Sequence, residues 1–203
     1  IWSGLNHPNV VPLRGYALQD DGTPMIISPW FEHGDVHSYL EDYPDADRKK
    51  IVRQVAEGLV YLHSQDPPVV HGDLKGGNVL IDKEGDAALC DFGLSTLLMV
   101  NPATMTMSTV AVGTVRWCAP ELLTSNVPEK TPASDVWAFA ALSLEILTGR
   151  IPFYTCTNDA KVIHDIAFGK IPVREDYPEL HPDSQFWEVL ESCWQQEPSD
   201  RPS

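Results

Sequence analysis

The chain has 203 residues, of which 43% are hydrophobic, and a formal net charge of −15 at pH 7. This length is sufficient for one domain with a substantial core. The excess of acidic side chains argues against binding to nucleic acid or to anionic membranes, because both are negatively charged. No apolar run approaches the length that crosses a bilayer. The cysteines lack metal-ligand spacing, so we expect reduced thiols in an intracellular, cytoplasmic protein. They are Cys90, Cys118, Cys156 and Cys193.

The first thirty residues favour two short strands. Residues 1–5 look like the end of a helix that Pro8 does not allow to continue. Residues 10–16 and 25–28 are apolar and β-prone, and Asp-Asp-Gly at residues 20–22 predicts the turn between them.

Two helices are expected next. Asp35 is suited to cap the N-terminus of a short helix. A longer helix is predicted over residues 45–64, because apolar residues recur there at helical spacing and form one buried stripe. These residues are Ile51, Val55, Leu59 and Leu62. Pro67 and Pro68 follow and prevent the helix from extending further.

The stretch at residues 71–93, HGDLKGGNVLIDKEGDAALCDFG, predicts a β-hairpin. Residues 79–81 and 87–90 read as its strands, and residues 82–85 read as its turn. A hairpin brings its two ends together, so polar residues that flank the strands are expected to converge.

The polar residues that flank this hairpin are Asp73, Asn78 and Asp91. Two carboxylates and an amide oxygen form a hard, oxygen-only set of ligands that suits Mg²⁺ better than zinc. Lys75 could add a positive charge beside the same site. Together these groups suit transfer of a phosphoryl group from a magnesium-bound polyphosphate.

The rest of the chain predicts a long loop and three helices. Residues 94–112 have few charges and no periodicity, which suggests a mobile functional loop. Residues 135–148, capped by residues 132–134 and stopped by Gly149, form a helix that is apolar nearly all round and therefore buried. Shorter helices are expected at residues 160–168 and 183–195. The last of these is expected to bury Phe186, Val189, Leu190 and Trp194.

Four ordered motifs resemble those of eukaryotic protein kinases, in particular the tyrosine-kinase-like group of Ser/Thr kinases. They are D-x-K-x-x-N from Asp73, D-F-G from Asp91, G-T-V-R-W-C-A-P-E at residues 113–121, and C-W-x-x-x-P-x-x-R-P-S at the end. The resemblance implies an α+β kinase fold, mainly the helical C-lobe with a partial β N-lobe. It would divide the chain into an N-lobe remnant (1–28), a hinge (29–34) and a C-lobe lacking its last helix (35–203).

The resemblance also implies roles for individual residues in phosphorylating Ser/Thr hydroxyls of protein substrates. Asp73 would accept the proton of the substrate hydroxyl, Lys75 would contact the γ-phosphate, and Asn78 and Asp91 would hold Mg²⁺. Asp73, Lys75 and Asn78 are the expected catalytic residues. The expected ATP-binding residues are Ser28, Phe31, Asp35, Lys75, Asn78, Leu80 and Asp91.

Three further expectations follow from the same resemblance. Asp135, an acid at the start of a buried helix, would accept backbone N–H bonds from the catalytic loop, the stretch that contains Asp73. A simple helix-capping role is also compatible. Arg201 would form a buried ion pair with Glu121. Candidate phosphorylation sites, each also readable as a solvated loop hydroxyl, are Thr96, Thr104, Thr106, Ser108 and Thr109.

The chain departs from the kinase pattern in two ways, which leave alternatives open. It contains no G-x-G-x-x-G and no V-A-I-K-like strand, so we expect these 203 residues by themselves to bind ATP poorly and to be nearly inactive. Gly72 replaces the usual Arg of H-R-D, which removes a cation for a loop phosphate and resembles the H-G-D of aminoglycoside and choline kinases. The alternatives are therefore a small-molecule phosphotransferase of that type, or a pseudokinase scaffold.

Overall fold

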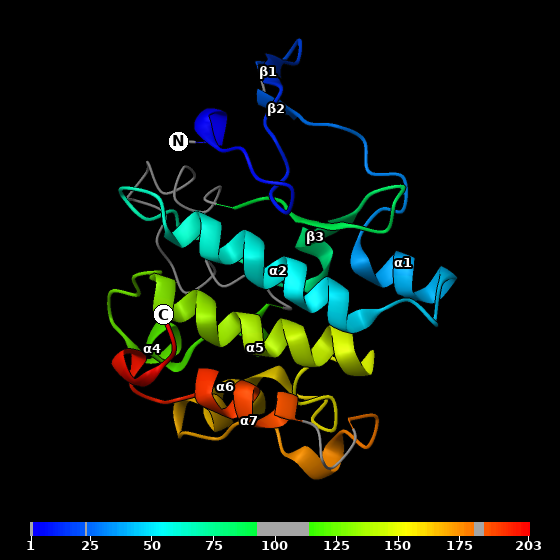
Figure 1. Cartoon of the computed structure of the whole chain (residues 1–203). Coiled ribbons are helices and arrows are strands. Elements are labelled where there is room, and N and C mark those ends of the chain that lie inside the picture. Colours follow the sequence, from blue (N-terminus) through cyan, green and yellow to red (C-terminus); the bar gives the residue numbers. More distant parts are fainter. Residues whose placement is uncertain (1, 23, 93–113, 181–184) are drawn as a thin grey trace. The chain divides into compact units, whose positions relative to one another are not determined.

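The structure, a computed structural model, describes residues 2–22, 24–92, 114–180 and 185–203 (Figure 1). Helices dominate these residues, together with two small antiparallel sheets, which confirms the α+β class. The chain forms two compact units, Ile1–Val69 with Gly77–Cys90, and Val70–Gly76 with Asp91–Ser203. The division into lobes and hinge stays a prediction. The loop predicted at residues 94–112, with its candidate phosphorylation sites, lies outside the described residues.

The first unit begins with a short 3₁₀ helix, Trp2–Gly4, and a two-stranded sheet. Strand β1 (Gly15–Leu18) pairs antiparallel with β2 (Pro24–Ile27). The strand predicted over residues 10–16 is therefore wrong at residues 10–14. Val11 instead donates its backbone N–H to Leu89 at 2.9 Å. Leu89 in turn donates its N–H to the Asn9 carbonyl at 2.9 Å, so the contact is an isolated parallel bridge between Val10 and Leu89.

The predicted hairpin is confirmed within the first unit. Strand β3 (Val79–Ile81) pairs antiparallel with β4 (Ala87–Leu89), and Val79 lies opposite Leu89. The turn closes through the Asp82 side chain, which accepts backbone N–H bonds from Glu84 and Asp86 at 3.0 and 2.9 Å.

Helices α1 (Val36–Asp42) and α2 (Arg48–His63) complete this unit. The Asp35 carboxylate caps α1 by accepting from the Ser38 backbone N–H at 2.9 Å, as predicted. Helix α2 begins three residues later than expected, because Asp47 caps it by accepting from the Lys50 backbone N–H at 3.0 Å. The predicted stripe is buried, with Ile51, Val55, Leu59 and Leu62 all at most 5% exposed.

Gly58 allows α2 to approach the chain at Asn9 closely, and we expect Gly58→Ala to destabilise the protein. A Cβ at this position would lie 2.5 Å from the Asn9 carbonyl oxygen, which already accepts from the Leu89 N–H at 2.9 Å. In an open helix the same change would stabilise by roughly 1 kcal/mol. Here overpacking should instead lower the free energy of unfolding by about 1–3 kcal/mol, measurable by urea denaturation.

Gly15→Ala is the matched control for this prediction. A Cβ at Gly15 would meet nothing within 4 Å. The two variants therefore differ in the space around the new methyl group. Equal stabilities of the two variants would contradict a tight contact at Gly58.

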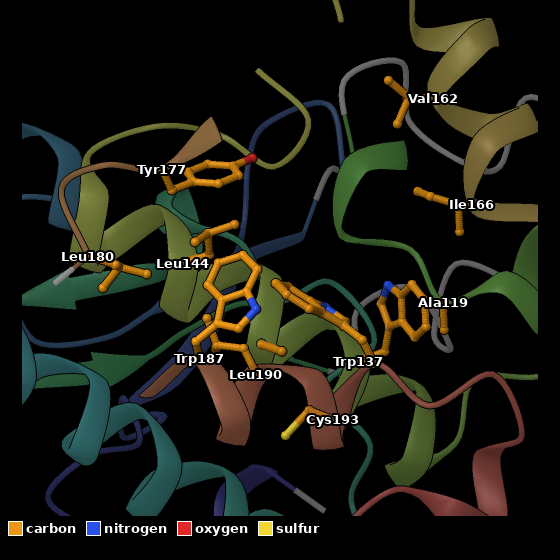
Figure 2. Packing of buried hydrophobic residues seen from close by; sticks show 12 residues of the cluster. Ala119, Trp137, Leu144, Val162, Ile166, Tyr177, Leu180, Trp187, Leu190 and Cys193 are labelled. Carbon is orange, nitrogen blue, oxygen red and sulfur yellow. The ribbon is translucent and has the colours of Figure 1, made fainter. Parts of the chain in front are cut away.

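The second unit is built around α5 (Pro132–Thr148), against which α7 (Gln185–Cys193) packs (Figure 1). Among the described residues of this unit, the other helices are α4 (Pro120–Thr124), α6 (Asp159–Ala167) and short 3₁₀ turns at Val115–Trp117, Arg174–Asp176 and Pro198–Asp200. Figure 2 shows the aromatic centre of the core, where Trp187 of α7 lies near Tyr177, Leu144 and Leu190, all at most 3% exposed. The prediction that α5 is buried is confirmed.

Two details of these helices differ from expectation. Helix α5 starts at Pro132 rather than Asp135, because Thr131 and Ser134 form a capping box. In α7, Val189 is 50% exposed, so its predicted burial is wrong. Trp187, at 3% exposure, aligns instead with Leu190 and Trp194 at helical spacing. None of the helices in the described ranges combines the length and the apolar character that a membrane span requires.

Candidate active site

Asp73 and Lys75 form an ion pair in the second unit. The Lys75 Nζ lies 2.8 Å from Asp73 Oδ2, and about a third of each side chain is exposed. The same ammonium donates to the Thr114 hydroxyl at 3.3 Å. The predicted positive charge beside Asp73 is therefore confirmed, and Thr114 is a partner that sequence reasoning did not assign. The pair leaves a carboxylate and an ammonium accessible together, as phosphoryl transfer to a hydroxyl requires.

The backbone before Asp73 is held by Asp135 in the first turn of α5. The Asp135 carboxylate is 1% exposed and accepts from the backbone N–H groups of His71 and Gly72 at 2.7 and 2.8 Å. Two such bonds compensate for burying the charge, and the positive end of the helix dipole stabilises it further. The predicted contact with this loop is confirmed.

Gly72 has a conformational reason to be glycine. Its φ is +75°, in the left-handed region that residues with a Cβ rarely adopt. The residue that departs from the kinase pattern therefore also fits a backbone requirement of this loop.

Asp91 and Phe92 show a contrast in exposure within one motif. Asp91 is exposed and has φ +58°, an uncommon conformation for a residue other than glycine and one that often marks functional sites. Phe92 is 4% exposed and packs edge-on against the buried His71 ring, with centroids 6.2 Å apart. The buried Phe92 ring fixes the chain beside the exposed Asp91.

Asn78 lies in the 3₁₀ turn Gly76–Asn78 and is 7% exposed. Its backbone oxygen accepts from the Cys90 N–H at 3.0 Å. Asn78 belongs to the first unit, whereas Asp73 and Asp91 belong to the second, so their convergence on one Mg²⁺ stays a prediction. The donor types still fit the ion, since amide and carboxylate oxygens are the ligands that magnesium prefers. Groups of three or more His, Cys, Asp or Glu placed to hold a metal ion are not found among the described residues.

Three of the residues expected to contact ATP come together within the first unit. Phe31 and Leu80 pack against one buried cluster of Val11, Ala88 and Cys90. Asp35 forms a β-bridge with Leu80 through its backbone, and its carboxylate is occupied by the cap of α1. Ser28 follows β2, is exposed and donates its hydroxyl to the Pro29 carbonyl at 3.3 Å. An apolar surface from Phe31 and Leu80 suits a flat heterocycle, and contact with ATP stays a prediction.

Glu145 is a buried acid of α5 whose role was not predicted. One of its oxygens, Oε2, accepts from the Gly76 backbone N–H at 3.2 Å and from the Trp117 indole at 3.0 Å. It therefore links the loop after Lys75 to the segment that contains Thr114. A charged residue inside an otherwise apolar helix is the signal that could have revealed it, because buried charges require partners.

The predicted pair of Arg201 and Glu121 is confirmed. Arg201 donates to both carboxylate oxygens of Glu121, at 2.7 and 2.8 Å, and its side chain is fully buried. The remaining donors reach the backbone carbonyls of Ala133, Gln195 and Gln196. This bidentate geometry ties α4 to the last residues of the chain.

Cys118 lies close to the ion pair of Asp73 and Lys75, and we expect its thiol to be unreactive at neutral pH. Burial raises the pKa of Cys118 to about 11, and the charges of Lys130 and Lys75, which lower this pKa, do not offset the effect of burial. Because the thiolate is the nucleophile, iodoacetamide at pH 8 should label Cys118 about tenfold or more slower in the native protein than in the urea-unfolded protein. Peptide mapping by mass spectrometry gives both rates. Equal rates in the two states would contradict the raised pKa.

The comparisons with known proteins agree with this geometry. The family model described as "Protein kinase domain" matches residues 1–203. The chain is 34% identical to serine/threonine-protein kinase CTR1 of Arabidopsis thaliana, over 100% of this chain and 24% of that protein. It is 32% identical to probable serine/threonine-protein kinase pats1 of Dictyostelium discoideum, over 100% of this chain and 6% of that protein.

A third relative is probable serine/threonine-protein kinase drkD of Dictyostelium discoideum, 32% identical over 98% of this chain and 15% of that protein. The chain thus spans a quarter or less of the length of each of these three relatives. The match to the family model covers every motif from which the site was assembled. Residues 1–203 therefore belong to the protein kinase domain family.

Proposed function

We propose that the chain acts within a serine/threonine protein kinase of the tyrosine-kinase-like group and transfers the γ-phosphoryl group of ATP to Ser or Thr hydroxyls of proteins. The observation that carries the proposal is the contact of Lys75 with both Asp73 and Thr114. This contact brings together the Asp73 carboxylate as a proton acceptor, the Lys75 ammonium as a cation for a phosphate oxygen, and the Thr114 hydroxyl from the segment that ends in A-P-E. The names of the relatives support the choice of Ser/Thr over Tyr.

The proposed reaction needs little chemistry from the protein. The substrate hydroxyl attacks the γ-phosphorus, the bond to the bridging oxygen of ADP breaks, and the hydroxyl proton passes to Asp73. Lys75 would contact the transferred phosphoryl group. Most of the rate is expected from positioning and charge neutralisation.

Asp91 and Asn78 would hold Mg²⁺, which supplies positive charge to the phosphate oxygens when it is bound. The exposed Asp91 carboxylate supports this assignment. Phe31 and Leu80 would contact the adenine ring, with Ser28 and Asp35 nearby along the chain.

The proposal extends to where the protein works. All four cysteines carry free thiols, including the buried Cys90 and Cys193. Free thiols are usual in reducing compartments. We infer an intracellular, cytoplasmic location, which fractionation of cells that express a tagged full-length protein would test.

The experiment offers the full-length protein radiolabelled ATP, Mg²⁺ and three sets of acceptors: Ser/Thr peptides, Tyr peptides, and choline with aminoglycosides. Label on Ser/Thr peptides that disappears in Asp91→Ala supports the proposal. Label on choline or an aminoglycoside alone would favour the small-molecule phosphotransferase that Gly72 suggests. Absence of transfer to every acceptor would favour the scaffold.

A further inference from the structure

Arg116 lies in the 3₁₀ turn Val115–Trp117, and its side chain is 8% exposed. Its guanidinium has five N–H donors, and the structure provides five acceptor contacts. Nε and Nη2 donate to Asp159 Oδ1 at 3.1 and 2.7 Å, and Nη2 also donates to the Cys156 carbonyl at 2.7 Å. Nη1 donates to the carbonyls of Pro152 and Phe153, both at 2.9 Å. A lysine, with three donors on one atom, could not reproduce this set of contacts.

The carbonyls that Arg116 binds belong to the loop between α5 and α6. Within this loop Phe153 has φ +55°, an uncommon conformation for a residue with a Cβ. Its N–H donates to the hydroxyl of the buried Tyr177 at 2.8 Å. The loop is therefore folded around the guanidinium on one side and packed on Tyr177 on the other.

Arg116 also lies next to residues that contact the candidate active site. Two residues before it, the Thr114 hydroxyl accepts from Lys75, which pairs with Asp73. One residue after it, the Trp117 indole donates to Glu145. Only Val115 separates Thr114 from Arg116, and the Thr114 carbonyl accepts the Trp117 backbone N–H at 3.2 Å. A shift of the turn that carries Arg116 would therefore move Thr114 relative to Lys75.

We propose that Arg116 is a positioning residue that fixes the Thr114–Cys118 segment on the α5–α6 loop, so that a peptide hydroxyl is presented correctly to Asp73. This inference rests on the proposed protein kinase function and adds a residue to it. The site for the peptide is assigned to this segment because Lys75 links it directly to Asp73. ATP is expected to make no use of the Arg116 contacts, so the effect should be confined to the peptide.

The test compares steady-state kinetics of the full-length protein with those of Arg116→Lys, with a Ser/Thr peptide and ATP varied in turn. We expect the peptide KM to rise about tenfold or more, while the KM for ATP stays within twofold. A purely structural role would lower the folded fraction, which reduces kcat and leaves both KM values unchanged. An unchanged peptide KM in Arg116→Lys would therefore overturn the inference.

Arg53→Lys is the matched control, since Arg53 lies in α2 with an exposed side chain whose Nε is 3.7 Å from the Glu57 carboxylate. If Arg116→Lys does not fold, the same two KM values, for the peptide and for ATP, are measured for Asp159→Ala. It removes the acceptor of two Arg116 donors and should raise the peptide KM at least severalfold. No change there overturns the inference. If neither the wild-type protein nor Arg53→Lys transfers phosphate to any peptide, the proposed function itself is refuted.

Discussion

Asp73→Asn is expected to reduce phosphoryl transfer to Ser/Thr peptides by about 10²–10⁴-fold, the usual contribution of a general acid or base. Asparagine keeps the shape of the side chain and its hydrogen bond from Lys75 but cannot take up the substrate proton. The carboxylate is also the partner of the Lys75 ammonium at 2.8 Å, so the variant additionally removes the charge that orients the lysine. The measurement is the initial rate of peptide phosphorylation by the full-length protein.

Stability should change little in Asp73→Asn. About a third of each side chain in the pair with Lys75 is exposed, and solvent screening keeps the contribution of such partly exposed pairs small. A melting curve close to that of wild type would show that the loss of rate is chemical. Asp42→Asn makes the same substitution at an exposed position of α1 and serves as the control. Full activity of Asp73→Asn would rule out its role in proton transfer.

Arg201→Met should have the largest effect on stability, lowering the free energy of unfolding by about 3–5 kcal/mol. Methionine fills much of the volume, but Glu121 loses both of its charged hydrogen bonds. The carbonyls of Ala133, Gln195 and Gln196 lose their donors as well. The guanidinium also lies over the Trp137 ring, with its carbon 5.2 Å from the ring centroid. Denaturant unfolding monitored by tryptophan fluorescence measures the change.

Two further variants separate the ion pair from its surroundings. Arg201→Met combined with Glu121→Leu should cost less than the two single changes added together, because no charge is then left without its partner. Arg150→Met removes an arginine of an exposed pair with Glu179 and should have a far smaller effect than Arg201→Met. Similar losses for Arg150 and Arg201 would mean that burial does not determine the effect.

Secondary structure was predicted correctly where it depends on residues that are close together in the sequence. The β3–β4 hairpin needs only two short β-prone runs and a turn, and both strands are where they were expected. The cap at Asp35 is similarly local, because the accepting carboxylate and the donating Ser38 N–H are three residues apart. The boundaries of α2 and α5 were less accurate, since Asp47 and Thr131 compete with nearby polar residues for the capping position.

Contacts between distant residues could be anticipated only where the kinase resemblance supplied the partner. The pairs Asp135 with the His71 backbone and Arg201 with Glu121 belong to this class. The partners of Arg116 and Glu145 could not be anticipated. The position of Glu145 in an apolar helix indicates that it needs a partner but not which one, and Arg116 is read from sequence only as an ordinary charge. Each of them needs hydrogen-bond partners because it is buried in the folded protein, where an unpaired charge is costly.

The order of amino acids alone therefore established the family motifs, the buried character of α5 and the candidate groups Asp73, Lys75, Asn78 and Asp91. Folding alone established that Val11 pairs with β4, that Val189 is exposed while Trp187 is buried, and that Arg116 gathers the α5–α6 loop. The physical reason is the same in each case. Periodicity and capping act over a few residues, whereas burial depends on which surfaces meet after the chain has folded.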